Sequence, residues 1–199
     1  MTTPPGGRPL VGRHVRLDPS IATDAAPLFA ALDHEEVWAG GYSGGPSARP
    51  SDAEQWAERI EAAANEPRAM YTVRRIADGE VLGTTSLGDT QLAHQRTHLG
   101  WTAYTPSMWG TVVNPECKLL LLTHAFETLR CIGVEFRTHW FNHASRTAIA
   151  RLGAKQDGVL RNHQLMPDGS RRDTVVFSIV DGEWLAVKAH LRFLLDRPR

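Results

Sequence analysis

The chain has 199 residues, enough for one domain with a sizeable hydrophobic core and too few to require two. Its 22 Lys and Arg residues balance 22 Asp and Glu residues, so the basic excess typical of nucleic-acid binding is absent. No apolar run approaches the roughly 20 residues of a membrane helix, and the N-terminus lacks the apolar segment of a secretion signal. We therefore expect a cytoplasmic protein with neither a membrane nor a nucleic-acid partner.

Alternating apolar and polar residues, bounded by Gly, Pro and Asp, predict most of the strands. Strands are expected at 14–19, 69–76, 81–88, 97–105, 133–140, 157–166 and 171–180. A turn at Asp78-Gly79 should join the second and third strands in a hairpin. A predicted helix separates strand 97–105 from strand 133–140, so these two should run parallel in one sheet. The pattern predicts a fold that contains both helices and strands, α/β in the broad sense. Its sheet should be mixed, as in α+β proteins, with about seven strands flanked by helices.

Helices are predicted where apolar residues recur at helical spacing. They are expected at 24–32, 51–65, 114–130, 142–153 and 181–195. Ser51 and Glu54 have the spacing of a capping box, and Asn142 is a typical N-cap. The helix 114–130 is apolar almost all round, which indicates burial against the sheet. We expect residues 1–10, rich in Pro and Gly, to be disordered and residues 11–199 to form one domain that ends in a helix.

The segment MWGTVVNPE, residues 108–116, is the one candidate anion site in this pattern. Asn114 as N-cap, Pro115 at the first helical position and Glu116 in the first turn predict a helix start. Backbone N–H groups of residues 110–113 would converge there beside the positive end of the helix dipole. Such an arrangement suits a pyrophosphate.

The two cysteines, Cys117 and Cys131, have neither CxxC spacing nor metal-ligand neighbours, so no metal site is expected. Cys117 falls in the first turn of the predicted helix, where the pKa of a thiol can be lowered. The alternative is a small residue packed inside the core.

Two stretches of the chain, GWTAYTPSMWGTVVNPECKLLLLTHAFE and the segment from Val134 to Ile179, resemble the GCN5-related N-acetyltransferases. Within that superfamily the chain is similar to the branch that resembles ribosomal-protein N-terminal acetyltransferases. The resemblance extends over about residues 10–190. It implies the GNAT fold, with splayed strands at the acyl-CoA site. It also implies an acyltransferase that moves the acetyl group of acetyl-CoA directly to a primary amine, on a small molecule or a protein N-terminus. A homodimer is compatible with this family.

The resemblance also implies which residues hold the acyl donor. The backbone of a central strand would bind the pantetheine, the loop after it would cradle the pyrophosphate, and the helix 142–153 would contribute an Asn-x-x-Ser motif with a nearby Arg. These residues are Trp101, Thr102 and Ala103, then Trp109, Gly110, Thr111, Val112, Val113 and Asn114, and finally Asn142, Ser145 and Arg146. Asn142 could instead only cap its helix, and Arg146 could be a solvated side chain.

Val112 departs from the family pattern, which has Gly at this position of the loop. If the backbone φ of Val112 is positive, strain of roughly 1 to 3 kcal/mol is expected. If φ is negative, only the bulk of the side chain would crowd the phosphate. The departure motivates an alternative function, a degenerate member that binds CoA or another ligand without turnover. A third reading is a partner-binding domain unrelated to CoA.

The resemblance implies that the Ser145 hydroxyl protonates the departing thiolate. His98 and His139 stand where related chains often carry acids, and a neutral imidazole can accept a proton near pH 7, so both are candidate bases. Acceptor recognition is expected from the loop 35–47 and the hairpin around Arg161 to Arg172, through Glu35, Trp38, Tyr42, Arg161 and His163. Core packing is the alternative role for Trp38, and a solvated helix end explains Glu35 equally well.

Overall fold

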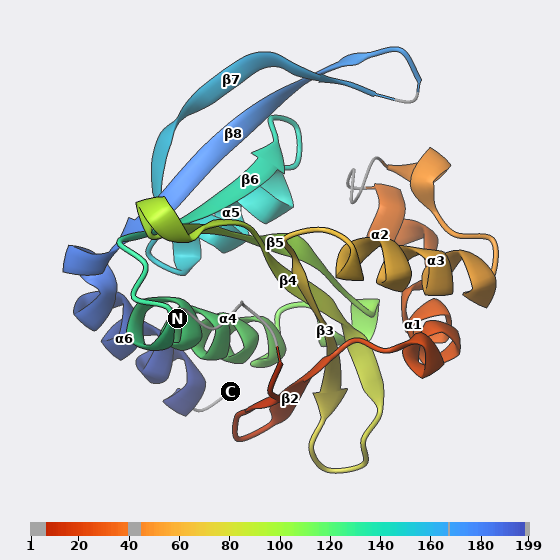
Figure 1. Cartoon of the computed structure of the whole chain (residues 1–199), viewed down its shortest axis with the longest axis horizontal. Helices are drawn as coiled ribbons and strands as arrows, with labels where there is room; N and C mark the ends of the chain where they lie inside the picture. Colours follow the sequence, from red (N-terminus) through yellow and green to blue (C-terminus); the bar gives the residue numbers. More distant parts are fainter. Residues whose placement is uncertain (1–6, 40–44, 167, 198–199) are drawn as a thin grey trace.

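The computed structural model describes residues 7–39, 45–166 and 168–197. Its centre is one eight-stranded sheet with the order β1-β2-β3-β4-β5-β6-β8-β7 (Figure 1). The strands are β1 (Leu10–Val11), β2 (Val15–Pro19), β3 (Ala69–Arg75), β4 (Val81–Gln91), β5 (Arg96–Tyr104), β6 (Gly133–His139), β7 (Lys155–Leu165) and β8 (Arg171–Val180). All neighbouring strands are antiparallel except β5 and β6. The predicted mixed sheet is therefore confirmed, and its extra strand is β1, which includes Leu10 from the segment expected to be disordered.

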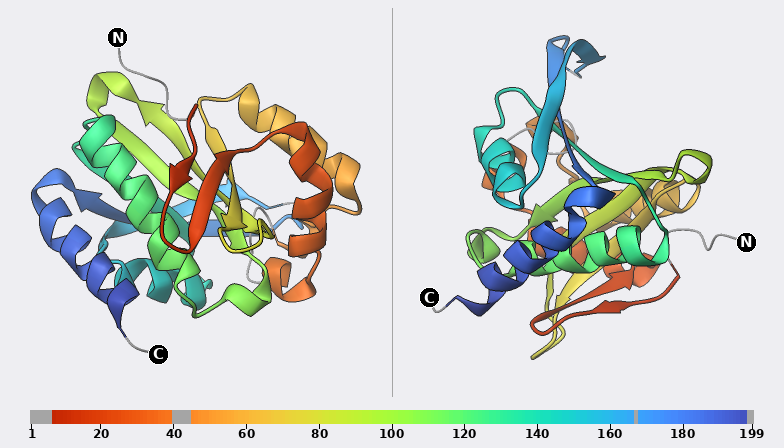
Figure 2. Two further views of the ribbon diagram at one scale, coloured as in Figure 1. Left: turned by 90° about the horizontal axis from the view of Figure 1, so that it is seen from below. Right: turned by 90° about the vertical axis from the view of Figure 1, so that its left-hand side faces the viewer.

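Helices cover both faces of the sheet (Figures 1 and 2). They are α1 (Ala25–Leu32), α2 (Glu35–Ala39), α3 (Ala53–Ala64), α4 (Val113–Thr123), α5 (His143–Arg151) and α6 (Asp181–Asp196). Helices α4 and α6 lie side by side and share a large apolar core with the strands, whereas α1 and α3 pack on a second, smaller core. None of the helices in the described ranges is long and apolar enough to span a membrane.

Three local predictions differ from the structure. The N-cap of α3 is Asp52, whose carboxylate accepts the Gln55 N–H at 3.0 Å, so the proposed Ser51 cap was wrong. The carboxylate of Asp competes well with Ser for this position. Helix α4 begins one residue before Asn114, with Val112 as N-cap, so Pro115 is its third residue and not its first. The segment 35–47 is not all loop, because it begins with the short helix α2.

Strands β5 and β6 pair over a short length only. Their parallel register includes Arg96, Thr97 and His98 and stops there, although β5 continues to Tyr104. On its other edge β5 carries a β-bulge opposite β4, between the pairs Ser86–Gly100 and Thr84–Ala103. A bulge bends its strand and increases the local twist, which carries the rest of β5 away from β6. The two strands therefore splay, as the resemblance implied.

Glu116 joins α4 to the N-terminal part of the chain. Its side chain is 2% exposed, and its carboxylate accepts the backbone N–H groups of Arg13 and His14, the latter at 3.0 Å. Glu116 was expected only to complement the helix dipole. Its position in the first turn allows that effect. The structure adds a second, buried role, in which the carboxylate accepts hydrogen bonds from two backbone N–H groups of the loop between β1 and β2.

We expect Glu116→Ala to lower the free energy of unfolding by roughly 1 to 3 kcal/mol, because two backbone donors lose their acceptor. Chemical denaturation at neutral pH measures this. Glu58→Ala on the exposed side of α3 is the control and should change stability by less than about 0.5 kcal/mol. Equal effects of the two substitutions would contradict the buried role.

Candidate active site

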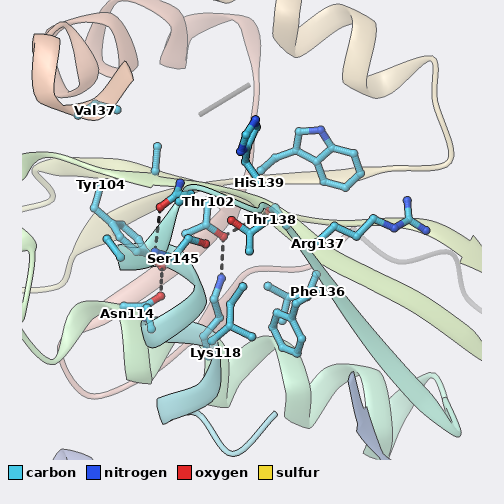
Figure 3. Close-up of a pocket in the computed structure, with 18 of the residues that line it drawn as sticks. Val37, Thr102, Tyr104, Asn114, Lys118, Phe136, Arg137, Thr138, His139 and Ser145 are labelled. Carbon is cyan, nitrogen blue, oxygen red and sulfur yellow. Dashed lines mark hydrogen bonds between the residues drawn. The ribbon is translucent and has the colours of Figure 1, made fainter. Parts of the chain in front are cut away.

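The gap between β5 and β6 opens into a cleft of about 610 Å³. Its lining comes from β5, β6, the loop after β5, α4 and α5, with α2 and the β7–β8 hairpin at the rim. Ten of the residues proposed from the sequence for the site line it: His98, Trp101, Thr102, Ala103, Trp109, Gly110, Asn114, His139, Asn142 and Ser145. These residues come from segments far apart in the sequence, and Figure 3 shows four of them, Thr102, Asn114, His139 and Ser145, around the cleft.

Trp101 forms the bulge of β5. Its backbone φ is +48°, unusual for a bulky residue, so the surrounding contacts must hold it there. The indole ring lies 4.8 Å from the His98 ring, and the Arg68 guanidinium stacks on it at 4.4 Å. Gly88 makes room on the neighbouring strand, since a Cβ there would lie 2.6 Å from the indole. The side chain of Trp101 therefore anchors the bulge, whereas the resemblance had implied a role for its backbone alone.

Lys118 lies directly beneath this bulge and is a site residue that the sequence patterns did not single out. Its side chain is 5% exposed, and Nζ donates to Thr102 Oγ1 at 2.6 Å and to Thr85 Oγ1 at 3.4 Å (Figure 3). Burial lowers the pKa of Lys118 to about 7. Both protonation states are therefore populated near neutral pH. The signal in the sequence was one cation inside an otherwise apolar helix, where it must be either buried or extended to solvent.

The loop after β5 has a conformation that Val112 fits without strain. The φ angle of Val112 is −71°, in the ordinary right-handed region, whereas the positive φ of the loop, +70°, falls on Gly110. Positive φ favours glycine, so the loop has its glycine where the backbone requires one. Val112 and its neighbours Thr111 and Val113 do not line the cleft. The strain considered for Val112 is therefore absent, and with it the main motive for a degenerate site.

Some backbone N–H groups of this loop already donate hydrogen bonds to acceptors in the same loop. The amide of Val113 donates to Thr111 Oγ1 at 3.3 Å, and the amide of Thr111 donates to the Met108 carbonyl. Asn114 does not cap the helix; its Oδ1 lies 3.4 Å from the hydroxyl of Tyr104, which donates to it. An anion at this helix start would find fewer free N–H groups than the sequence suggested.

Asn142 caps α5, as predicted. Its Oδ1 accepts the backbone N–H of Ser145 at 2.9 Å, which fixes the first turn of α5 at the cleft wall. The Arg146 side chain does not line the cleft, because its guanidinium donates to the Trp140 carbonyl and stacks on the Trp140 ring at 4.4 Å. Asn142 and Ser145 thus remain candidates for ligand contact, and Arg146 lies just outside.

The two candidate bases are poorly set up to take a proton. Burial, reinforced by the charge of Arg137, lowers the pKa of His98 to about 4, so this imidazole is neutral at pH 7 but a weak base. Neither of its ring nitrogens has a hydrogen-bond partner among the described residues. His139 uses its Nδ1 to accept the Phe141 N–H at 3.0 Å, so in the neutral ring the proton resides on Nε2. Burial and then the charge of Arg172 lower the pKa of His139.

The proposed acceptor residues are mostly away from the cleft. Trp38 is 1% exposed and donates through Nε1 to the Leu32 carbonyl, so its role is in the core. Glu35, Arg161 and His163 do not line the cleft, although Glu36, Gln164 and Arg172 from the same segments do. The segments predicted for acceptor recognition therefore reach the cleft through neighbouring side chains, because helix and strand periodicity decide which neighbour faces inward. Tyr42 lies outside the described residues.

Cys117 has no chemical role at this site. It is fully buried, and burial raises the pKa of its thiol to about 12. The low-pKa reading was wrong, and the packing alternative holds.

Comparison with known proteins defines the class of this fold and cleft. A protein from T. thermophilus, described as a candidate acetyltransferase, is 35% identical over 95% of this chain and 97% of its own, with a TM-score of 0.83. A GCN5-related N-acetyltransferase from Brucella melitensis is 26% identical over 97% and 87%, with a TM-score of 0.89. RimJ from Mycobacterium smegmatis, solved with CoA-disulfide, has a TM-score of 0.77 at 20% identity over 92% and 90%. A search of curated proteins found no significant match.

The sequence family confirms this class. Residues 14–155 match the model of the acetyltransferase (GNAT) domain, which is more than half of the chain. The chain therefore belongs to the GCN5-related N-acetyltransferase superfamily and is an acyltransferase. Its structural neighbours include ribosomal-protein acetyltransferases as well as RimJ.

Lys118→Met should remove a pH dependence of stability. The pKa of Lys118 is about 7 in the fold against an ordinary 10.5, so between these values the unfolded chain binds more protons and stability rises with pH. From about pH 7 to 8.5, the wild type should gain roughly 1 to 2 kcal/mol relative to Lys118→Met. Denaturation at several pH values measures the difference. Lys155→Met, at a side chain that is 76% exposed, should show no such trend. If the stability difference from the wild type is independent of pH for both variants, the low pKa of Lys118 is contradicted.

Val112→Gly should leave the dissociation constant for CoA within about threefold, because Val112 is unstrained and does not line the cleft. The variant should lose roughly 0.5 to 1 kcal/mol of stability through added freedom in the unfolded chain. Gly110→Ala is the matched substitution and should weaken CoA binding more, since it forces a Cβ into positive φ. Calorimetric titration with CoA measures the dissociation constant of each variant. A large gain in affinity for Val112→Gly would show that the valine crowds the phosphate.

Proposed function

We propose that this chain is an acetyl-CoA-dependent N-acetyltransferase that moves the acetyl group directly to a primary amine of a small molecule or a protein N-terminus. The observation that carries the proposal is the end of β5–β6 pairing at His98. Beyond it, the adjacent edges of two parallel strands diverge around a cleft that leads to the start of α4. A peptide-like ligand such as pantetheine can hydrogen-bond to such an edge as an added strand would.

We assign parts of acetyl-CoA to segments that line the cleft. The backbone of Trp101, Thr102 and Ala103 is the proposed contact of the pantetheine arm. The segment 109–114 would hold the pyrophosphate at the start of α4, with Gly110 giving the loop its turn. Asn142 and Ser145 also line the cleft, and we assign Arg146, whose guanidinium contacts Trp140, to attraction of the 3′-phosphate.

Acetyl transfer to an amine requires that the amine lose a proton and that the departing thiolate gain one. Ser145 is the proposed donor to the thiolate, because its hydroxyl lies at the cleft wall in a turn fixed by Asn142. The described histidines at the cleft supply no strong base, so we propose that the amine reaches the cleft neutral or loses its proton through water. Orientation of the two reactants then supplies much of the rate.

A CoA-binding protein without turnover is the second candidate. One observation favours it: His98 is a weak base and the Nδ1 of His139 is already engaged. The Val112 argument no longer supports it.

The proposal predicts micromolar or tighter binding of acetyl-CoA and release of free CoA thiol when a panel of primary amines is added. Calorimetry and a thiol assay measure the two quantities separately. Absence of binding at millimolar acetyl-CoA would contradict any CoA site, and binding without thiol release over the whole panel would favour the second candidate.

Ser145→Ala should lower kcat by roughly a hundred- to ten-thousandfold, the range expected for loss of a positioned acid, with little change in KM for acetyl-CoA. Steady-state kinetics with any amine from the panel that is acetylated provides the measurement. The matched control is Thr147→Ala, which removes a hydroxyl from an exposed position of the same helix and should keep full turnover. Unchanged kcat in Ser145→Ala would remove this residue from the mechanism.

A further inference from the structure

We propose that the acceptor carries a carboxylate close to its amine and that Arg172 binds this carboxylate at the rim of the cleft. The inference rests on the proposed acetyltransferase function and names the chemical class of its acceptor. It follows from three features: the place of Arg172, its lack of an acidic partner among the described residues, and the way the neighbouring charges are balanced.

Arg172 lies at the start of β8, in the hairpin that β7 and β8 form. Figure 1 shows this hairpin extending from the edge of the sheet above the splay and toward the side of α2. Arg172 and Gln164 from the hairpin, together with Glu36 and Val37 from α2, line the cleft. The hairpin and α2 therefore both contribute side chains to the cleft, separately from the loop at 109–110, to which the pyrophosphate is assigned.

The guanidinium of Arg172 has spare donors. Nε donates to Thr174 Oγ1 at 3.1 Å, and Nη1 and Nη2 make no hydrogen bond within the described ranges of the chain. No carboxylate of those ranges lies within ion-pair distance of it. Burial lowers the pKa of Arg172, and no acidic group of the described chain opposes this effect. An arginine nevertheless stays protonated, so a half-buried positive charge stands at the cleft without a counter-charge from the residues that the structure describes.

Two other arginines near this part of the cleft have acidic partners. Arg161, on the same hairpin, pairs with Asp173 at 2.6 Å, and Arg137 on β6 pairs with Asp89 at 2.8 Å. The acid nearest to Arg172 in the sequence is therefore already engaged by another residue. Thr174 is 1% exposed, and its hydroxyl holds the Nε side of Arg172 in place. The planar fork of a fixed guanidinium matches a carboxylate in bidentate geometry.

Glu36 adds the opposite charge from α2. It is the one carboxylate among the described residues that line the cleft, and the structure records no ion pair for it within those residues. A cleft rim with an arginine on the hairpin and a glutamate on α2 complements a molecule that carries both a carboxylate and an ammonium group. Small amino acids have this chemistry, whereas a simple alkylamine lacks the carboxylate.

The alternative ligand of Arg172 is an anionic group of CoA. The test therefore distinguishes an acceptor carboxylate from a CoA phosphate. The probes are the common L-amino acids and the matching L-amino acid amides, in which the carboxylate is replaced by a neutral group. Thiol release gives kcat/KM for each member of a pair with the wild type and with Arg172→Gln. The amine of an amide is less basic, but this difference is the same for both proteins and cancels in the ratio.

We expect the wild type to acetylate at least one amino acid, and Arg172→Gln to lower kcat/KM for it by about ten- to a hundredfold, as for loss of a charge-assisted hydrogen bond. The value for the matching amide should change by less than about threefold. Arg161→Gln, on the same hairpin with its charge paired to Asp173, is the control and should show no selective loss. CoA affinity by calorimetry should be the same in all three proteins.

The proposal is overturned if Arg172→Gln affects acid and amide equally, if it weakens CoA binding instead, or if the wild type acetylates only amines without a carboxylate. Saturation-transfer NMR measures amino-acid binding in the presence of CoA. It distinguishes failure of the carboxylate subsite from failure of the proposed acetyltransferase function. Amino acids that bind through Arg172 without thiol release would contradict the enzyme and support the subsite. Absence of binding by every amino acid would contradict the subsite.

Discussion

The site depends on one constraint in the sheet, the early end of pairing between β5 and β6. Parallel strands normally continue their ladder until one of them ends, but here β5 extends to Tyr104 after its pairing with β6 has stopped at His98. The bulge at Trp101 makes this possible, because it turns β5 while the strand keeps its contact with β4. The cleft, the position of the loop that follows and the exposure of strand backbone all result from this divergence.

The divergence has an energetic cost that side chains around the bulge offset. Trp101 is held in an unfavourable backbone region by the Arg68 guanidinium over its ring and by contact with the His98 ring. Below the bulge, the Lys118 ammonium or amine tethers α4 to Thr102, whose hydroxyl also lies 2.8 Å from that of Thr85. A buried lysine is costly to keep in a fold, and a pKa of about 7 is the sign of that cost. Its retention at this point fits a requirement for a polar group where the strands separate.

Much of the fold could be predicted from the sequence because its signals are local. Turn residues, strand alternation and the parallel crossover predicted the mixed sheet, and Asn142 was recognised as a cap from its residue type and position. The start of α4 was misplaced by one residue, because Asn114 and Pro115 fit the preferences for cap and first-turn positions better than Val112 and Val113 do. At this helix start, the geometry of the preceding loop outweighs the residue preferences for cap and first-turn positions.

The site was harder to predict because it depends on which of two neighbouring side chains faces the cleft. Glu35 and Glu36 look alike in sequence, and only the helix orientation places Glu36 on the lining. The same holds for His163 and Gln164 on a strand interrupted by a bulge, where simple alternation fails. Lys118 was missed, and the contacts of Glu116 and Arg172 were not foreseen, for another reason: they depend on burial and on partners that the sequence pattern does not reveal. The family resemblance singled out the loop after β5 and the Asn-x-x-Ser turn, parts of which line the cleft, but it could not show that φ of Val112 is negative.

Hydrogen exchange with and without acetyl-CoA tests the central claim most directly, because it reports on the separated strand edge itself. If the splay is the acyl-donor site, saturating acetyl-CoA should slow amide exchange in peptides that contain residues 99–104 and 109–114, with smaller changes in β1, β2 and α6. Protection confined to other segments, or none at a concentration that saturates binding, would contradict the assignment of the β5–β6 gap as the place where the protein binds its acyl donor.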